Sequence, residues 1–200
     1  MIKNLPSLEQ LMRLLQHIPH LPSKNIFKIA DFFLSMTPEQ IDQFCTSIKN
    51  AHARISLCKR CFFLCEQNTL CEFCQSQERN KHIVCVVETW QDLLAIEKTN
   101  AYEGVYHVIA GALSPLDGIT ADQLHIEPLV DRVKTERIEE IILCTNQTPE
   151  GEATAMYIAR KLKGLPVTIS CLARGLPVGS QLGASDRLTV YKALTHRRPF

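Results

Sequence analysis

The 200-residue sequence has no long apolar run and almost no excess of charge. No stretch approaches the roughly 20 apolar residues that a membrane-spanning helix needs. Residues 1–6 open no apolar run of signal-peptide length. The 22 basic and 21 acidic side chains give a net charge of +1, which excludes a uniformly basic nucleic-acid binder. No repeat or low-complexity tract occurs, and a content of 46% hydrophobic and 22% charged residues excludes wholesale disorder.

The near-neutral total hides three segments of different charge. Residues 1–80 carry 9 basic and 7 acidic side chains, residues 81–159 carry 5 and 13, and residues 160–200 carry 8 and 1. Basic ends and an acidic middle indicate separate surfaces for separate partners.

Nine cysteines are present, and five of them fall between residues 58 and 74. Such clustering favours metal ligands in a reducing cytoplasm over a disulfide scaffold. Cys58 and Cys61 form one C-x2-C knuckle, and Cys71 and Cys74 form a second one nine residues later. Four thiolates in this spacing suit one structural, tetrahedral zinc ion per chain. Cys65 leaves an alternative open, because it could replace Cys58 in the set of four.

Apolar residues at helical spacing predict three short helices within the first 54 residues. Ser7, Ser23 and Thr37 are the predicted N-caps. Ser7 with Gln10 is predicted to form a capping box, and so is Thr37 with Gln40, with Pro38 at the first helical position.

From about residue 81, the pattern changes to short apolar runs without alternation, at residues 83–87, 106–110, 141–144 and 167–170. Segments with helical spacing lie between them, notably residues 93–98, 126–133 and 152–163, and a last helix is expected within residues 186–198. Strands buried on both faces that alternate with helices predict a parallel α/β sheet.

Acidic residues follow two of the predicted strands. Glu88 ends the first strand, and the loop after the third strand leads to Glu150 and Glu152. Carboxylates at strand ends can hold Mg²⁺ for phosphoryl transfer, but Asn146 and Thr148 in this loop are neutral. The alternative is that Glu150 and Glu152 only stabilise the positive end of the next helix.

Basic residues gather near helix starts and in the cysteine segment. Lys24 and Lys28 lie four residues apart at the start of the second predicted helix, where free amides favour a phosphate. Together with Arg54 and Arg60 they are the predicted DNA contacts.

Several ordered strings carry a family resemblance that spans essentially the whole chain. They are the four knuckle cysteines, residues 83–88, Val105-Tyr106-His107-Val108, Ser114-Pro115-Leu116-Asp117-Gly118-Ile119, residues 150–155 and Ala173-Arg174-Gly175-Leu176-Pro177-Val178-Gly179. In this order they resemble the RecR family of bacterial recombination mediators.

The resemblance implies an α+β multi-domain protein of four parts. These are a helix-hairpin-helix region at residues 1–54, a four-cysteine zinc finger at 55–78, a parallel α/β Toprim domain at 79–172, and a C-terminal helical segment at 173–200 that contacts other subunits. It also implies no catalysis, so no catalytic residue is expected.

The family implies a set of partners. Its members bind DNA, here expected as single strands and gapped duplex, and act with RecO and RecF to place RecA on single-stranded gaps. Several assemble as ring-like tetramers, so a dimer or tetramer is expected, in the cytoplasm with the nucleoid and without a membrane.

Comparison with catalytic Toprim loops indicates a site that has lost its chemistry. In type I topoisomerases this loop looks like Asp-Pro-Asp-Arg-Glu-Gly-Glu, and its two aspartates hold Mg²⁺. Asn146 and Thr148 stand in those two places. The remaining acids Glu88, Glu150 and Glu152, with Asn146, are therefore the predicted protein-binding face, with RecO as the expected partner.

Two departures from the family pattern have expected consequences. The family hairpin looks like Leu-Pro-Gly-x-Gly-Pro-Lys-Ser, and His20 and Pro22 stand in its glycine places. Pro22 lacks an amide donor and His20 adds bulk, which predicts weaker and more salt-sensitive DNA binding. Arg187 replaces an acid in the C-terminal segment, which bears on subunit contacts there.

Two other functions compete with the mediator. The first is a Mg²⁺-dependent Toprim nuclease or primase relative, which the neutral residues at 146 and 148 disfavour. The second is a zinc-ribbon interaction module without a role on DNA.

Overall fold

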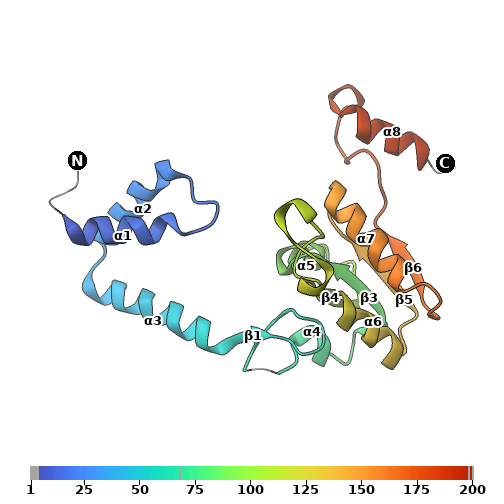
Figure 1. The fold of residues 1–200 in the computed structure, drawn as a ribbon, viewed down its shortest axis with the longest axis horizontal. Coiled ribbons are helices and arrows are strands. Elements are labelled where there is room, and N and C mark those ends of the chain that lie inside the picture. The colour runs from blue at the N-terminus through green and yellow to red at the C-terminus, as the bar shows by residue number, and fades with distance from the viewer. Residues whose placement is uncertain (1–4, 68, 198, 200) are drawn as a thin grey trace. The chain divides into compact units, whose positions relative to one another are not determined.

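The computed structural model of the chain describes residues 5–67, 69–197 and 199, and it divides into two compact units, residues 1–55 and 56–200 (Figure 1). The description leaves out residues 1–4, which belong to the N-terminal segment that has no signal-peptide pattern. It also leaves out Arg198, which belongs to the predicted last helix. Among the helices of the described ranges, none is long and apolar enough to cross a membrane.

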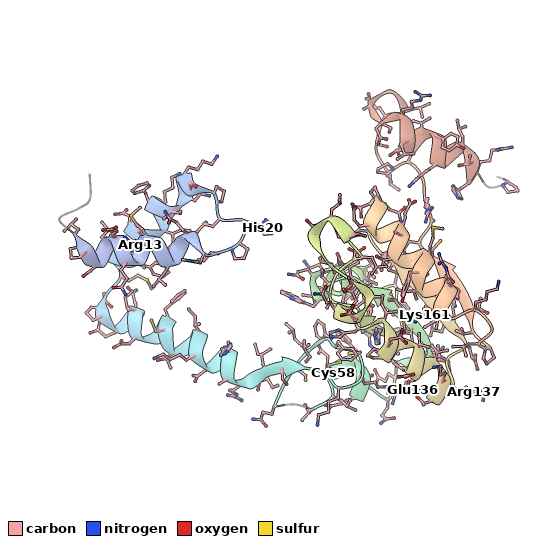
Figure 2. All side chains as sticks on the ribbon, viewed as in Figure 1. Arg13, His20, Cys58, Glu136, Arg137 and Lys161 are labelled. Carbon is pink, nitrogen blue, oxygen red and sulfur yellow. The ribbon has the colours of Figure 1, made fainter. Side chains whose placement is uncertain are left out.

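The first unit is helical. It consists of α1 (Pro6–Gln16), α2 (Ser23–Ser35) and α3 (Pro38–Arg54). Helices α1 and α2 share a small core of Leu15, Ile26 and Ala30. His20 lies in the turn between them with a φ of 58° (Figure 2), a left-handed conformation that favours glycine. A glycine-like backbone is therefore kept at position 20, whereas Pro22, in the second glycine place, has a φ of −63°.

The three predicted N-caps differ in outcome. Thr37 caps α3, and its hydroxyl and the Gln40 side chain form the complete capping box. The predictions for Ser7 and Ser23 are wrong, because each serine lies inside its helix and makes no cap bond. Helix α1 starts two residues earlier than a Ser7 cap implies, at Pro6 with Leu5 as the N-cap, since proline suits the first helical position.

The second unit begins with a small two-stranded sheet and a short helix. Strand β1 (Ile55–Leu57) pairs with β2 (Leu64–Glu66), and α4 (Glu72–Gln75) follows. The five clustered cysteines, Cys58 to Cys74, lie on β2 and α4 and in the loops before these elements.

A four-stranded, all-parallel sheet forms the centre of this unit. Its strands are β3 (Asn80–Val87), β4 (Gly104–Val108), β5 (Glu140–Cys144) and β6 (Thr168–Cys171), in the spatial order β4-β3-β5-β6. The connections contain α5 (Trp90–Glu97), α6 (Ile126–Thr135) and α7 (Pro149–Lys161), with two short 3-10 turns, η1 (Pro115–Asp117) and η2 (Ala121–Gln123). After β6 the chain passes through η3 (Leu182–Ala184) to α8 (Arg187–Thr195).

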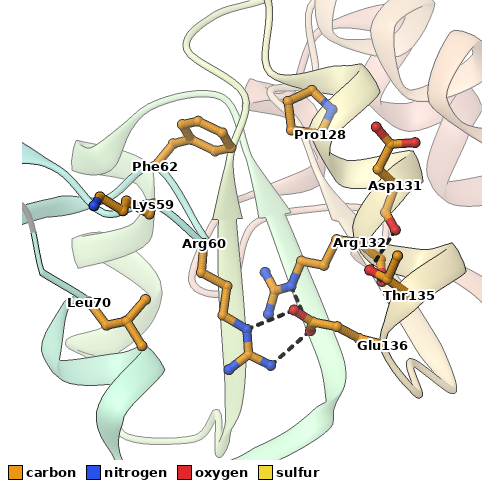
Figure 3. A pocket seen from close by; sticks show the side chains of 9 residues that line it. All are labelled: Lys59, Arg60, Phe62, Leu70, Pro128, Asp131, Arg132, Thr135 and Glu136. Atoms are coloured by element: carbon orange, nitrogen blue, oxygen red, sulfur yellow. Dashed lines mark hydrogen bonds and ion pairs between the residues drawn. The ribbon is translucent and has the colours of Figure 1, made fainter.

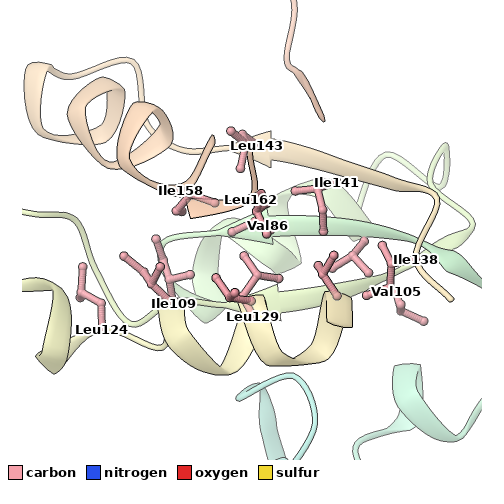
Figure 4. Close-up of a cluster of buried hydrophobic side chains, with 14 residues drawn as sticks. Val86, Val105, Ile109, Leu124, Leu129, Ile138, Ile141, Leu143, Ile158 and Leu162 are labelled. Carbon is pink, nitrogen blue, oxygen red and sulfur yellow. The ribbon is translucent and has the colours of Figure 1, made fainter. Parts of the chain in front are cut away.

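The two faces of the sheet bury different partners. Val84 and Val86 of β3 pack with α6 and α7 side chains such as Leu129 and Ile158 (Figure 4). The alternate residues of β3, Cys85 and Val87, pack with α5 and with the cysteine segment. Burial on both faces explains why the strands read as continuous apolar runs.

The strand and helix boundaries differ from the predictions by a few residues, for local reasons. Strand β4 ends at Val108 and not at residue 110, because Ala110 has a φ of 70° and Gly111 follows with 138°. Helix α5 begins at Trp90, since Thr89 and Asp92 form a capping box that the apolar spacing did not reveal.

The outer edge of β4 is covered by hydrogen bonds from other elements. Arg79 donates to the carbonyl of Gly104 (2.9 Å), and Arg132 donates to the carbonyl of Tyr106 (2.8 Å). The backbone N–H of Val108 donates to the carbonyl of Cys61 in the first knuckle (2.8 Å). The free edge of this strand is therefore closed by two arginines and the cysteine segment.

Candidate functional site

Four of the five clustered cysteines meet in one buried group. The sulfurs of Cys58, Cys61, Cys71 and Cys74 all lie within 4.8 Å of one another. In the first knuckle, a turn with Phe62 at a φ of 60° brings the amide of Cys58 to the carbonyl of Phe63 (2.7 Å). In the second, Cys71 precedes α4 and its amide donates to the sulfur of Cys58 (3.3 Å).

The group has the geometry and the electrostatics of a metal centre. Tetrahedral zinc with sulfur ligands places the sulfurs about 3.8 Å apart, which fits the observed spread. A hydrogen bond to Cys71 and burial raise the pKa of the Cys61 thiol, so a cation is needed for all four thiols to ionise. The buried group of Cys58, Cys61, Cys71 and Cys74 is the cluster that could hold a metal ion in the described part of the chain. Cys65 lies outside this group, and its thiol donates to the carbonyl of Thr69 (3.2 Å).

A second site lies at the carboxyl ends of β3 and β5. The strand order reverses direction here, because β4 lies on one side of β3 and β5 and β6 on the other. Ligands of open parallel sheets bind at such a switch point. Glu88 leaves β3 and is only 7% exposed, and Asn146 follows β5 by two residues.

Asn146 donates two hydrogen bonds to the Glu88 carboxylate. Its backbone N–H donates to Oε1 (2.7 Å) and its side-chain amide donates to Oε2 (2.6 Å). Both oxygens of Glu88 are therefore bonded to the residue that stands in place of a Mg²⁺-binding aspartate. Sequence reasoning placed both residues at one crevice but did not find this bond.

The other predicted residues of this face lie on α7. Thr148 is its N-cap and accepts from the amide of Gly151 (3.1 Å), and Glu150 and Glu152 lie in its first turn. Glu150 is exposed, whereas Glu152 is bonded to Lys192 of α8 and lies 3.8 Å from Arg174. The Lys192 bond lowers the pKa of Glu152. The structure thus brings Glu88 and Asn146 together and gives Glu152 partners from the basic C-terminal segment.

Gly151 lies where the structure leaves no room for a side chain. A Cβ atom at this position would come within 2.2 Å of the Asn146 carbonyl oxygen and 2.7 Å of Glu88 Oε1. We expect Gly151→Ala to lower the free energy of unfolding by about 1–3 kcal/mol, measured by urea denaturation. Gly183→Ala, where a Cβ meets open space, should change it by less than about 0.5 kcal/mol. Equal effects of the two substitutions would contradict the close packing described here.

The predicted DNA contacts belong to different elements. Lys24 and Lys28 are exposed on the first two turns of α2, and Arg54 is the exposed last residue of α3. Arg60 is half-buried in the first knuckle, and its guanidinium makes two hydrogen bonds to Glu136 at the end of α6 (2.9 and 2.8 Å).

The sequence did not predict the contact between Arg60 and Glu136. A second arginine bonds to the same glutamate. Arg132 Nε donates to the same carboxylate (3.1 Å). Burial raises the pKa of Glu136, but the two arginines outweigh it and leave the pKa lowered. Arg60 and Glu136 are 76 residues apart in the sequence, so no local pattern predicts their contact. The position of Arg60 next to Cys61 predicted only a role for Arg60 itself.

Comparisons with known proteins agree with this architecture. Residues 82–173 match the family model described as a Toprim domain. The Recombination protein RecR of Myxococcus xanthus is 40% identical over 191 residues, which cover 96% of each chain. That of Geobacter sulfurreducens is 41% identical over 96% of this chain and 95% of its own, and that of Trichlorobacter lovleyi is 39% identical over 98% of both.

These findings confirm the predicted α+β multi-domain class, with a parallel Toprim sheet, flanking helices and a four-cysteine cluster that can bind a metal. Relatives at about 40% identity match over nearly their whole length, and they share a name tied to recombination. The chain belongs to the RecR family of recombination proteins.

Proposed function

We propose that the protein is a non-enzymatic recombination mediator. It binds single-stranded DNA and gapped duplex, and together with RecO and RecF it helps load RecA onto single-stranded gaps. Family membership supports the role in recombination and repair. The segregation of charge along the chain supports separate DNA-binding and protein-binding surfaces.

The observation that carries the non-enzymatic assignment is the bond between Asn146 and Glu88. A divalent ion at the strand ends needs several oxygen ligands with negative charge. Here both Glu88 oxygens already accept from Asn146, and Thr148 is occupied as the N-cap of α7. The polar groups at these strand ends thus bond to one another within the protein, which favours a role in binding over phosphoryl transfer.

The test is a nuclease and topoisomerase assay with the purified full chain. We expect neither cleavage nor relaxation of supercoiled DNA in Mg²⁺. A Mg²⁺-dependent activity that Glu88→Ala abolishes would overturn the assignment and favour a Toprim enzyme.

We propose that the cysteine cluster holds one structural zinc ion per chain. Cys58, Cys61, Cys71 and Cys74 would all be ligands, which leaves no open position for a substrate. Zinc would then stabilise the finger and hold Arg60 and Phe62 against the sheet domain.

The four segments implied by the family would then have different binding roles. Residues 1–54 and Arg60 in the finger (55–78) would contact DNA, although the Glu136 pair makes Arg60 the least accessible of these contacts. The Toprim domain (79–172) would present Glu88, Asn146, Glu150 and Glu152 to RecO. A partner that meets Glu152 must compete with Lys192 and Arg174.

The C-terminal segment, residues 173–200, would contribute to a dimeric or tetrameric ring. Helix α8 exposes Leu188, Tyr191 and Leu194 at a spacing of three residues, and an exposed apolar row of this kind supports a subunit contact. We place the assembly in the cytoplasm, with the nucleoid.

The DNA contacts yield a testable prediction. Replacing Lys24 and Lys28 together by alanine should weaken binding of single-stranded oligonucleotides. The slope of log affinity against log salt should fall by about 1.4, since each lost phosphate contact on a single strand removes about 0.7. Fluorescence anisotropy at several salt concentrations measures this slope.

The matched control replaces Lys98 and Lys163, two exposed lysines of the second unit, by alanine. An unchanged slope in the Lys24 and Lys28 variant, or an equal change in the control, would remove α2 from the DNA-binding surface.

A further inference from the structure

A groove separates the first knuckle from helix α6, and of its lining residues only Arg60 is among the DNA contacts proposed above (Figure 3). It is open to solvent and has a volume of about 500 Å³. One wall comes from the finger and the other from α6, and the lining residues are Lys59, Arg60, Phe62, Leu70, Pro128, Asp131, Arg132, Thr135 and Glu136.

The groove holds more positive than negative charge. Arg60 and Arg132 share the single carboxylate of Glu136, so one of the two guanidinium charges lacks its own counterion. Lys59 is exposed at the rim and adds a third cation. The other acid, Asp131, faces Lys134 of its own helix at 3.4 Å.

One donor in this groove has no acceptor. The Arg132 side chain is only 4% exposed, and its Nε and Nη1 are bonded to Glu136 and to the carbonyl of Tyr106. Its Nη2 is buried without a hydrogen-bond partner. Because an unpaired buried N–H costs about 1–3 kcal/mol, such a group points to an acceptor that the chain itself does not supply.

Apart from Thr135, the uncharged lining residues are apolar. Phe62 stacks on His125 with ring centroids 3.9 Å apart, and Leu70 and Pro128 are exposed beside it. An anion that fits this groove therefore has a large apolar group next to its negative charge.

We propose that the groove binds an acidic peptide segment of a partner protein, with a carboxylate at Arg60 and Arg132 and a neighbouring apolar side chain against Phe62 and Leu70. A carboxylate matches the planar guanidinium donors. A nucleic-acid strand fits less well, because one face of the Phe62 ring is already stacked on His125 and is not available to a base. The proposal does not depend on the DNA contacts proposed for α2.

The test uses a fluorescein-labelled peptide of aspartates ending in phenylalanine, with a free C-terminus, and the full chain. We expect saturable binding that weakens about tenfold in Lys59→Glu and in Leu70→Gln, which change the charged rim and the apolar wall separately. Arg137→Glu is the matched control, since this arginine is 83% exposed near the end of α6 and outside the groove, and it should bind as the unaltered chain does. Circular dichroism melting verifies that each variant is folded.

Two further arms identify the ligand. An amidated peptide tells whether the terminal carboxylate or an aspartate side chain is recognised, and replacement of phenylalanine by alanine tests the apolar contact. Absence of binding at millimolar peptide, or binding that neither groove variant weakens, would overturn the proposal. So would a groove variant that weakens an oligonucleotide but not the peptide, because the groove would then belong to the DNA-binding surface.

Discussion

Cys61→Ser should remove the bound metal and unfold the finger. Cys61 lies at the centre of the group, 3.3 Å from the sulfur of Cys71, and is fully buried. Structural zinc sites of this kind contribute about 10–16 kcal/mol of apparent binding free energy at neutral pH, and a hydroxyl is a poor replacement for a thiolate. We expect the metal content to fall from one zinc per chain to nearly none.

The loss should also lower the thermal stability of the second unit. The knuckles share a core with the sheet through Phe63 and Phe73, so an unfolded finger exposes one face of β3 and β4. A loss of about 5 kcal/mol would lower Tm by roughly 10–20 °C in a chain of this size. Differential scanning calorimetry, with elemental analysis of the same samples, measures both effects.

Cys65→Ser is the matched control, because it removes a thiol from the same segment but outside the cluster. It should retain one metal per chain and change Tm by only a few degrees. The reverse result, with metal lost in Cys65→Ser and kept in Cys58→Ser, would show that the alternative set of four cysteines is the correct one.

Asn146→Asp should destabilise the protein in the absence of divalent ions and create a response to Mg²⁺. The substitution replaces an amide donor 2.6 Å from Glu88 Oε2 with a second carboxylate. The lost hydrogen bond and the new repulsion at a site where Glu88 is 7% exposed should cost about 3–5 kcal/mol. Millimolar Mg²⁺ should recover part of this loss, since two adjacent carboxylates are typical Mg²⁺ ligands.

Asn146→Ala separates the two effects. It removes only the side-chain donor, while the backbone N–H still bonds to Glu88 Oε1. We expect a smaller loss of about 1.5–3 kcal/mol and the same Tm in EDTA and in Mg²⁺. If Asn146→Asp melts at the same temperature as the unaltered chain in EDTA, the bond between Asn146 and Glu88 does not hold this crevice together.

Local patterns predicted the elements of this fold well. The C-x2-C spacing predicted that four of five clustered cysteines converge, and Thr37 with Gln40 predicted the start of α3. The apolar runs located all four strands of the parallel sheet, because strands buried on both faces carry a continuous signal.

Contacts between distant segments were not predictable in this way. The charge pattern predicted Arg60 as a DNA contact but gave no indication of its partner Glu136. Glu88 and Asn146 were assigned to one crevice because strand ends meet there, yet hydrogen-bond geometry depends on side-chain rotamers. The wrong N-caps have local causes. Pro6 takes the first helical position of α1 and places Ser7 inside the helix, whereas α2 begins at Ser23 itself, with Pro22 as the N-cap.

The covered edge of β4 links the metal centre to solubility. Val108 is bonded to the carbonyl of Cys61, and Arg79 and Arg132 hold the carbonyls of Gly104 and Tyr106. If the first knuckle unfolds, the backbone of β4 loses the Cys61 contact and its apolar cover, and an uncovered edge strand readily pairs with another chain. Oxidised or chelated protein should therefore self-associate through intermolecular β-structure, so that the bound ion acts as protection against aggregation as well as a support for the finger.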